Sequence, residues 1–395
     1  MQTVRTFSTE GASKYVVGNG SMTMKGVILP GPNEKMYVEQ FNIPKPQVGE
    51  VLIKTKACGV CHTDLHVIKG EQKFPTPAVL GHEVSGTVLE HGPGTDPATI
   101  KRLPVGARVV GAFIMPCGGC FFCTRGQEEI CETFFEFNRF KGTLYDGTTR
   151  LYTAKGGTPI SQYSMSGLAE YCVMPASALA VLPEKLPFAE SAIMGCAIFT
   201  AYGALRNGAD LRAGETVAVV GVGGVGGGVV QLAKAFGAKT VIAVDISDEK
   251  LRSAKKLGAT HVVNGAKENV AEKVREYTAG RGVDVAVEAL GKAVTFGQAL
   301  AAVRDGGRAV MVGIAPTGAM AEVEITRIVR KEIRIIGSYG ARTRHDLPDV
   351  IDLAAMGKFD VAAPVSRRYT LDTAADAYAA LDRGEIDGRA IVLMD

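Results

Sequence analysis

The sequence predicts an α/β protein with two domains, one rich in short strands and one built on a doubly wound parallel sheet. Three observations indicate this: closely spaced β-rich runs before residue 197, alternating strand-like and helix-like runs after it, and a glycine fingerprint between a strand and a helix. The chain has 395 residues, 46% of them hydrophobic and 22% charged. That length and composition suffice for two domains, each with its own core.

The β-rich part follows a polar stretch. Residues 1–22 are rich in Gly and Ser and show no periodicity, so we interpret them as an N-terminal extension. From residue 23 on, short apolar runs such as KGVILPG, EVLIKTKACGV and VSGTVLEHG are separated by Gly and Pro. Strands at such close spacing predict an irregular, mainly β core up to residue 197.

The parallel sheet is predicted over residues 198–338. The runs TVAVVGV, TVIAVDI, VDVAVEAL and GGRAVMVGI have the continuous apolar character of strands buried on both faces. Amphipathic runs such as DEKLRSAKKLGA lie between them and predict the connecting helices. Near residue 339 the chain leaves this sheet, and its last stretch is typical of a helix followed by a strand.

A dinucleotide site is predicted at the first turn of this sheet. Gly221, Gly223 and Gly226 match G-x-G-x-x-G directly after a strand and at the start of a helix. These glycines permit a tight turn, the approach of a pyrophosphate and close helix packing. Asp245 ends the next strand, where a carboxylate can accept the ribose hydroxyls and repel a 2′-phosphate, so NAD is favoured over NADP. A glycine turn without a ligand is the alternative.

A structural metal site is predicted in the segment PCGGCFFCTRGQEEIC. Its four cysteines follow C-x2-C-x2-C-x7-C and can deliver four thiolates to a tetrahedral Zn²⁺: Cys117, Cys120, Cys123 and Cys131. An iron–sulfur cluster and free buried thiols are the alternatives, but the bacterial ferredoxin spacing and its following proline are absent from this run. Four sulfurs leave no open position, so this metal would stabilise a lobe and take no part in the chemistry.

The reactive site is predicted in ACGVCHTDLHVIKG, residues 57–70, together with VLGHEVSG. A catalytic zinc needs three protein ligands and one open position. Cys61 and His82 are good candidates, but spacing does not exclude Cys58, His62 or His66. Spacing also leaves the third ligand open among Cys172, Cys196 and Glu83.

The remaining composition limits the partners. The net charge of +3 is too small to predict nucleic-acid binding, and no apolar run reaches the length of about 18 residues that a membrane helix needs. The eight cysteines are clustered and no signal peptide precedes them, which favours metal binding over disulfides. We therefore expect a cytoplasmic protein with no nucleic-acid or membrane partner.

Six motifs together resemble the zinc-containing alcohol dehydrogenases of the medium-chain dehydrogenase/reductase family: ACGVCHTDLHVIKG, GHEVSG, the four-cysteine run, MGCAIFTAYGAL, GVGGVG and VDI. They occur in order from Met24 to Asp395. The resemblance implies a GroES-like catalytic domain, residues 23–197 and 339–395, and a Rossmann NAD-binding domain, residues 198–338. It also implies that residues 93–109, which exceed the family's usual segment, form a surface loop.

The resemblance assigns two zincs per chain, one catalytic and one structural. Cys61, His82 and Cys196 would bind the catalytic zinc, and the four-cysteine run the structural one. Cys58 and Cys172 would be buried thiols. Asp64 would orient the ligand histidine from behind. Glu83 matches an acid beneath the metal, whose role stays open.

The resemblance also assigns the proton relay and the coenzyme site. Thr63 would touch the substrate oxygen, and His66 would pass its proton to solvent. His62 and Arg389 would meet the coenzyme pyrophosphate. The residues expected to contact NAD are His62, Thr200, Gly221, Gly223, Gly224, Val225, Gly226, Asp245, Lys250, Tyr339 and Arg389.

The expected function is a zinc- and NAD-dependent alcohol dehydrogenase, which reversibly transfers a hydride from the zinc-bound alkoxide of a primary alcohol to NAD⁺. Phe113, Ile114 and Glu136 are expected near the substrate channel, and the Phe and Ile side chains favour an apolar or aromatic alcohol. Residues 141–152 resemble a segment of glutathione-linked relatives, so a thiol-dependent formaldehyde dehydrogenase is the alternative. A non-enzymatic zinc- and NAD-binding protein is the alternative from another class. The resemblance further implies a homodimer or homotetramer.

Overall fold

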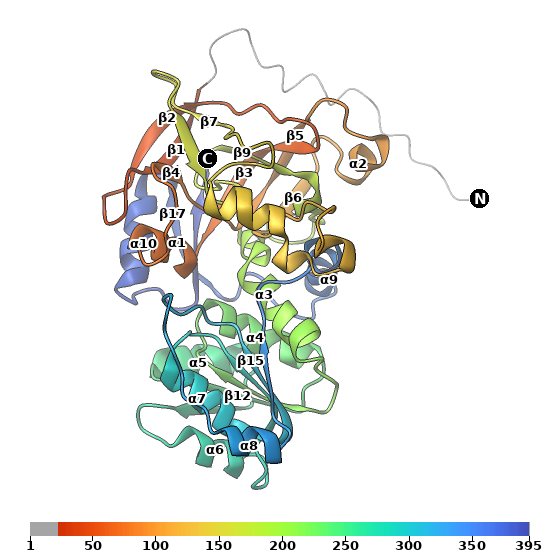
Figure 1. Ribbon diagram of the computed structural model, residues 1–395, viewed down its shortest axis with the longest axis vertical. Helices are drawn as coiled ribbons and strands as arrows, with labels where there is room; N and C mark the ends of the chain where they lie inside the picture. Colours follow the sequence, from red (N-terminus) through yellow and green to blue (C-terminus); the bar gives the residue numbers. More distant parts are fainter. Residues whose placement is uncertain (1–22, 395) are drawn as a thin grey trace, which may run out of the picture.

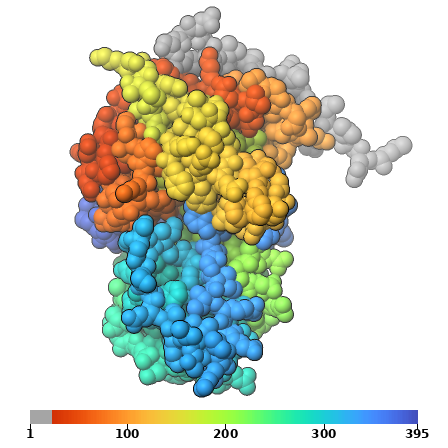
Figure 2. All heavy atoms as spheres, in the orientation of Figure 1, coloured from red at the N-terminus to blue at the C-terminus, as the bar shows by residue number. Residues whose placement is uncertain are grey.

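The computed structural model describes residues 23–394, which form two stacked lobes (Figure 1). The predicted extension, residues 1–22, lies outside the described residues. In the space-filling view the upper lobe is coloured mainly red to yellow and the lower lobe green to blue, and dark blue atoms of the C-terminal segment flank the upper lobe (Figure 2). The predicted α/β class, a β-rich domain with a doubly wound parallel-sheet domain, is confirmed.

The upper lobe is built from short strands: β1 (Thr23–Leu29), β2 (Tyr37–Asn42), β3 (Glu50–Val60), β4 (Ala78–Val79), β5 (Val84–His91), β6 (Arg108–Gly111), β7 (Leu151–Tyr152), β8 (Pro159–Gln162), β9 (Tyr171–Pro175), β10 (Leu179–Val181), β17 (Val365–Thr370) and β18 (Arg389–Leu393). One sheet has the order β2-β1-β4-β8-β7. The other has the order β10-β6-β5-β3-β18-β17, and β9 also pairs with β3. The long strand β3 is therefore the centre of this lobe.

Helical segments outside the parallel sheet connect these strands: α1 (His62–Ile68), α2 (Pro97–Arg102), α3 (Ala197–Gly203), α9 (Thr343–Ala355) and α10 (Ala374–Asp382), with shorter turns at Cys123–Arg125, Glu128–Ile130, Phe134–Phe140, Ala176–Ala178, Glu190–Gly195, Ala204–Gly208 and Leu371–Thr373. Residues 93–109 are not purely a loop, because α2 forms within them. The Asp96 carboxylate accepts the amide of Thr99 at 2.9 Å, and Pro97 occupies the first turn. Both features favour helix initiation.

The lower lobe is a fully parallel sheet with the strand order β13-β12-β11-β14-β15-β16. Its strands and helices are β11 (Thr216–Val220), α4 (Gly224–Ala235), β12 (Thr240–Asp245), α5 (Asp248–Leu257), β13 (His261–Asn264), α6 (Val270–Glu276), β14 (Val283–Glu288), α7 (Ala293–Ala302), β15 (Val303–Met311), α8 (Ile325–Arg330) and β16 (Arg334–Gly337). All five residues of β11 are buried, as expected for a central strand covered on both faces. Strand order reverses between β11 and β14, which is where open parallel sheets bind ligands.

The C-terminal segment returns to the upper lobe. Strand β18 pairs antiparallel with β3, with Ala390 opposite Val60. This pairing places Arg389 beside the end of β3, directly before Cys61. Within residues 23–394, every helix is too short or too polar to cross a membrane.

Candidate active site

Three segments distant in the sequence meet at a buried cluster of metal-binding side chains. Cys61 follows β3, His82 precedes β5, and Cys196 precedes α3. One ligand atom from each of these residues and one carboxylate oxygen of Glu83 all lie within 4.8 Å of one another. All four residues are buried. The structure thus brings the three residues that the resemblance assigns to the catalytic zinc together, with Glu83 as a fourth neighbour.

The Asp64 carboxylate orients the imidazole of His82 by a hydrogen bond to its Nδ1 atom. The distance from His82 Nδ1 to Asp64 Oδ1 is 3.0 Å, and the same oxygen accepts the amide of Gly81 at 3.2 Å. Tyr378 donates its hydroxyl to Asp64 Oδ2 at 3.0 Å. His82 Nε2 is buried and has no hydrogen-bond partner among the described residues. A nitrogen oriented in this way, beside two cysteine sulfurs, fits a zinc ion.

The two cysteines of the CGVC run differ in environment. A hydrogen bond with Cys196 lowers the pKa of Cys61 well below its usual range, against the effect of burial and with help from His82. Burial instead raises the pKa of Cys58, whose thiol packs where a side chain on Gly81 would clash. The thiolate is the metal-binding form of cysteine. Cys61 therefore fits a ligand and Cys58 fits a buried thiol.

Glu83 and Arg389 form a buried ion pair directly beside the metal cluster. Both carboxylate oxygens of Glu83 accept from Arg389 Nη2. Burial raises the pKa of Glu83 to about 7, although Arg389 opposes this rise. A Cβ atom on Gly59 would lie 1.9 Å from a Glu83 oxygen, so only glycine fits there. A Cβ atom on Gly224 would lie 2.5 Å from Arg389 Nη1, which places this guanidinium against the glycine-rich turn.

The four-cysteine segment forms a second group with metal-ligand geometry. One sulfur from each of its cysteines lies within 4.8 Å of the others: Cys117, Cys120, Cys123 and Cys131. Backbone amides point at these sulfurs, for example from Cys120 to Cys117 Sγ at 3.4 Å and from Phe134 to Cys131 Sγ at 3.4 Å. Partial burial raises the pKa of Cys120, but the amide of Cys123 and other donors outweigh it and lower the pKa to about 6. Such donors stabilise thiolates and fit a closed tetrahedral zinc site.

The glycine-rich turn has the geometry that a dinucleotide needs. Gly221 has φ +88°, which glycine tolerates best. A Cβ atom on Gly226 would lie 1.9 Å from the Gly221 carbonyl oxygen, whereas one on Gly223 would meet nothing within 4 Å. Helix α4 begins at Gly224, so its unpaired amides face the open side of this turn. Gly228 permits α4 to approach α3, because a Cβ there would lie 3.1 Å from Ala201.

Asp245 is fixed at the end of β12. Its carboxylate accepts three backbone amides, from Val222 at 3.0 Å, Ile246 at 2.8 Å and Ser247 at 3.0 Å. These three donors fix the orientation of the carboxylate. The carboxylate therefore lies beside the glycine-rich turn, where an adenosine ribose is expected.

His62, at the start of α1, has basic side chains as neighbours. Partial desolvation lowers the pKa of His62, and the charges of Arg389, His66 and Lys250 lower it further. Lys250 belongs to α5 of the lower lobe, whereas His62 and Arg389 belong to the upper lobe. The structure thus brings these three predicted coenzyme contacts to one place between the lobes.

The predicted relay residues lie along α1. Thr63 Oγ1 is 3.6 Å from Cys61 Sγ, beside the metal cluster. His66 is partly exposed one turn further on, and its Nδ1 is 2.5 Å from Glu71 Oε2. Glu71 and Tyr378 both support predicted site residues but were missed from the sequence, since neither belongs to a recognisable motif.

Aromatic rings surround the metal cluster on one side. The rings of Phe113 and Tyr163 each lie 5.9 Å from the His82 ring, and Tyr339 lies 5.6 Å from Phe113. Thr200 lies on α3, one turn after Cys196, whose carbonyl accepts the Thr200 amide at 2.7 Å. These rings, including the unpredicted Tyr163, give the site an apolar and aromatic wall.

The other two predicted channel residues lie differently. Ile114 is fully buried, and its carbonyl accepts a hydrogen bond from Thr343 at 2.8 Å. Glu136 is exposed at the surface, where its carboxylate accepts from Lys141 at 2.8 Å. Glu136, the charged residue expected near the substrate channel, thus forms an ion pair at the surface instead.

Val225 lies in the first turn of α4 and is half-buried, directly after the glycine-rich turn. Together with Gly221, Gly223, Gly224 and Gly226, it places five of the expected coenzyme contacts at this turn, and Asp245 lies beside them.

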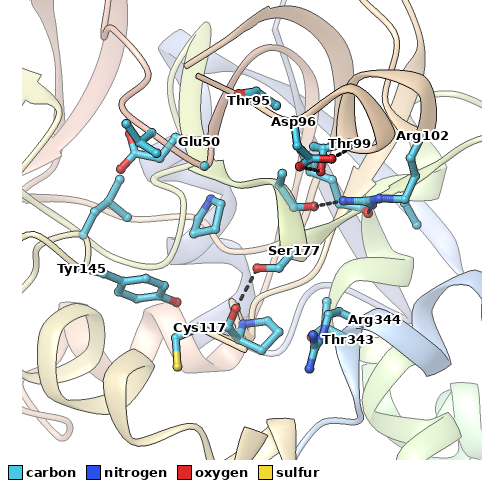
Figure 3. Close-up of a pocket in the computed structure, with 18 of the residues that line it drawn as sticks. Glu50, Thr95, Asp96, Thr99, Arg102, Cys117, Tyr145, Ser177, Thr343 and Arg344 are labelled. Carbon is cyan, nitrogen blue, oxygen red and sulfur yellow. Dashed lines mark hydrogen bonds between the residues drawn. The ribbon is translucent and has the colours of Figure 1, made fainter. Parts of the chain in front are cut away.

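A large cavity of about 1130 Å³ lies elsewhere in the upper lobe (Figure 3). Of the predicted site residues, only Cys117 lines it. Polar groups in its wall are bonded to one another: Ser177 donates to the Pro116 carbonyl at 2.7 Å, and Arg102 donates to the carbonyls of Ala176 and Leu179 at 2.9 Å. Because none of Cys61, His82 and Cys196 lines it, this cavity is not the candidate active site.

Comparison with known proteins adds to this geometry. Residues 47–184 match the family described as alcohol dehydrogenase GroES-like domain, and residues 224–356 match the family described as zinc-binding dehydrogenase. An alcohol dehydrogenase of Geobacillus stearothermophilus is 36% identical over 376 residues, 94% of this chain and 100% of the relative. An S-(hydroxymethyl)glutathione dehydrogenase of Paracoccus denitrificans is 30% identical over 382 residues, again 94% of this chain and 100% of the relative.

Two solved structures share the fold over almost the whole chain. An alcohol dehydrogenase zinc-binding domain protein from Burkholderia ambifaria has a TM-score of 0.88 and 31% identity, covering 95% of this chain and 99% of that one. The benzyl alcohol dehydrogenase from Acinetobacter calcoaceticus has a TM-score of 0.87 and 29% identity, covering 95% and 100%. With 95% of this chain covered in each comparison, the similarity extends over both lobes.

Proposed function

Because this chain belongs to the zinc-containing alcohol dehydrogenases of the medium-chain dehydrogenase/reductase family, we propose that it reversibly oxidises a primary alcohol to the aldehyde with NAD⁺. The observation that carries the proposal is the buried group of Cys61, His82 and Cys196. The surroundings of Cys61 favour its thiolate, and His82 Nε2 has no hydrogen-bond partner within residues 23–394. Three protein ligands leave the open position that a catalytic zinc requires. We propose a second, structural zinc for the four-cysteine segment.

The bound groups would supply the chemistry that side chains lack. Zinc would supply Lewis acidity toward the oxygen of the alcohol, and NAD⁺ would supply the hydride acceptor. The chain itself positions these groups: Asp64 orients His82 behind the metal cluster, and the turn from Gly221 to Gly226 presents helix amides to the coenzyme phosphates.

The proton of the alcohol would leave along α1. Thr63 Oγ1 lies beside Cys61, where it can accept the hydroxyl proton of a substrate. His66 lies one turn away and is partly exposed, so its imidazole can release a proton to water. Glu71 orients His66 at this exit. The arrangement keeps the charged base away from the metal cluster.

Asp245 supports NAD⁺ as the coenzyme. Its carboxylate is held by three amides and lies beside the glycine-rich turn. Ribose hydroxyls can donate to it, whereas the 2′-phosphate of NADP⁺ would meet like charge. We also propose that Lys250 and Arg389 contribute positive charge on the pyrophosphate side, where the His62 imidazole can donate a hydrogen bond.

The aromatic wall supports an alcohol with an apolar or aromatic body. Phe113, Tyr163 and Tyr339 lie next to the ligand histidine. The second candidate is oxidation of the formaldehyde–glutathione adduct. It is supported by the S-(hydroxymethyl)glutathione dehydrogenase of Paracoccus denitrificans, which is 30% identical.

We further propose that the protein assembles as a homodimer or homotetramer through the lower lobe. Strand β16 is an edge strand, and large apolar side chains are exposed on and near it: Ile325, Val329 and Ile335. An uncovered apolar sheet edge favours pairing with another copy. Sedimentation equilibrium tests this, since a monomer at micromolar concentration would contradict it.

The function is tested with a substrate panel on the purified, zinc-loaded protein. Benzylic and straight-chain primary alcohols are compared with formaldehyde plus glutathione, using NAD⁺ and NADP⁺, and metal content is measured in parallel. Turnover of free alcohols with NAD⁺ and two zincs per chain is the expected result. Turnover only with formaldehyde plus glutathione would favour the second candidate, and no turnover by protein holding two zincs would contradict both.

A further inference from the structure

A buried guanidinium without a counter-charge lies beside the aromatic wall. Arg139 is in the π-helical turn Phe134–Phe140 and is only 3% exposed. Its Nε, Nη1 and Nη2 atoms are all without a hydrogen-bond partner among residues 23–394. Other buried arginines of this lobe differ, since Arg150 pairs with Glu50 and Arg389 pairs with Glu83. Because a buried charge without a hydrogen-bond partner is unfavourable, an anion bound beside Arg139 would be stabilised there.

The position of Arg139 places it at the active site. Its guanidinium carbon lies 4.2 Å from the centre of the Tyr163 ring and 5.7 Å from that of Phe113. These are the two rings that each lie 5.9 Å from the ring of His82. The guanidinium is therefore one aromatic ring away from a ligand of the metal cluster. The rings attract the cation through their faces, but they leave its N–H donors unfilled.

The acids of the neighbourhood are engaged elsewhere. Asp64 accepts from His82, Gly81 and Tyr378. Glu136, in the same turn as Arg139, is exposed and pairs with Lys141. The coenzyme phosphates are expected on the other side of the cluster, at the glycine-rich turn beside Arg389.

Tyr163 adds a second unfilled donor. Its hydroxyl is fully buried and has no partner in the described part of the chain. A phenol hydroxyl carries its proton at neutral pH and can donate it in a hydrogen bond. An acceptor beside Arg139 would thus meet one charged and one neutral donor.

We propose that Arg139 binds a carboxylate of the substrate, so that the enzyme prefers an aromatic alcohol or aldehyde that carries a carboxylate at the end away from the reacting carbon. This inference rests on the proposed function. A guanidinium binds a carboxylate through two parallel hydrogen bonds, and the aromatic wall provides faces for an aromatic body. Arg139 is thereby a specificity-determining residue.

The test compares four benzylic alcohols on the zinc-loaded enzyme with NAD⁺. Two are neutral, benzyl alcohol and 4-(hydroxymethyl)benzamide, and two carry a carboxylate, 4-(hydroxymethyl)benzoate and 3-(hydroxymethyl)benzoate. We expect kcat/KM for at least one acid to exceed that for the amide by about 10- to 100-fold, the typical effect of a charged hydrogen bond. The gain should lie mainly in KM, because the carboxylate does not react.

Four variants locate the effect. Arg139→Met should abolish the preference for the acids while benzyl alcohol is still oxidised, and Arg139→Lys should retain part of it. Arg125→Met is the matched control: Arg125 also lies over a ring, that of Phe121 at 3.7 Å, but is exposed, and its loss should leave the preference unchanged. Tyr163→Phe should weaken binding of the acid more than of benzyl alcohol.

Two further measurements separate recognition from folding. Terephthalate should inhibit competitively with the alcohol, and this inhibition should be lost in Arg139→Met. The Tm of Arg139→Met should not fall, because an apolar side chain there removes an uncompensated charge. A merely structural arginine would instead lower Tm on replacement and affect all substrates equally.

The inference is overturned if benzyl alcohol is oxidised as well as both acids, or if Arg139→Met lowers kcat/KM for acid and benzyl alcohol by the same factor. A higher kcat/KM for the formaldehyde–glutathione adduct than for both acids would also overturn it. In each of these outcomes an alcohol is turned over, so the proposed function stands. Failure to oxidise any compound would instead contradict the proposed function.

Discussion

Arg389 donates to both carboxylate oxygens of Glu83, although 306 positions separate the two residues in the sequence. The pair is formed because β18 aligns beside the end of β3. Both side chains are buried, at 5% and 0% exposure, so each depends on the other for its counter-charge.

Replacing one member of this pair should destabilise the upper lobe. Glu83→Gln leaves the guanidinium of Arg389 buried and uncompensated, which typically costs about 3–5 kcal/mol. We expect a clearly lower Tm by calorimetry on the zinc-loaded protein. The double variant Glu83→Gln/Arg389→Met should recover part of the loss, and a double variant no more stable than Glu83→Gln would contradict this account.

Asp64→Asn should weaken zinc binding at the buried cluster. The carboxylate accepts from His82 Nδ1 at 3.0 Å and thereby orients its other nitrogen. Loss of such a partner typically lowers metal affinity by about 10- to 100-fold. Zinc release to a competing chelator measures the change. Asp210→Asn, at an exposed position, is the control, and equal release rates in the two variants would argue against the orienting role.

Cys61→Ser and Cys58→Ser should behave in opposite ways. Cys61 lies in the metal cluster, so its replacement should remove one zinc per chain and nearly all turnover. Cys58→Ser should keep both zincs and the activity, with about 1–3 kcal/mol less stability if the buried hydroxyl finds no partner. Metal analysis and kinetics decide, and zinc loss in Cys58→Ser would reverse the two assignments.

Cys120→Ser should separate the two metals. Its sulfur belongs to the four-cysteine segment, which contains none of the other metal cluster's residues. We expect loss of one zinc and a lower Tm, while the zinc at Cys61 is retained. The two sites can be followed separately after zinc is replaced by cobalt, which absorbs visible light. If the Cys120→Ser protein then lacks the absorption bands of both sites, the two sites are not independent.

Asp245→Ala should reduce the preference for NAD⁺ over NADP⁺. Removing the carboxylate removes the ribose acceptor, and we expect the KM for NAD⁺ to rise about 10- to 100-fold. Three amides also lose their acceptor, so Tm should fall as well. Asp305→Asn, an exposed acid in the same lobe, is the control. An unchanged ratio of kcat/KM for the two coenzymes would contradict the assignment.

The fold was largely predictable from the sequence because its signals are local. The apolar strands of the lower lobe and the turn at Gly221 are each encoded within a few residues. The helix α2 was missed, although Asp96 and Pro97 form a standard helix start. There the resemblance pointed to an inserted loop and the local signal was not used.

The site was only partly predictable, because it is assembled from distant segments. Spacing identified Cys61 and His82 but could not choose the third ligand, since Cys196 reaches the cluster only through tertiary packing. The resemblance supplied that choice, and the structure places Cys196 there. Tyr378 and Arg139 carried no sequence signal: one reaches Asp64 across 314 positions, and the other lies in an irregular turn.

The return of the C-terminal segment to β3 imposes an order on biosynthesis. A ribosome delivers the ligands Cys61, His82 and Cys196 long before it delivers Tyr378 and Arg389. Until then Asp64 lacks the hydroxyl of Tyr378, Glu83 lacks the guanidinium of Arg389, and β3 lacks its neighbour β18. While the coenzyme domain is still being translated, the nascent chain therefore contains the candidate zinc ligands but lacks Tyr378 and Arg389. Completion of the catalytic centre is consequently a late step of folding that is coupled to the pairing of β18 with β3.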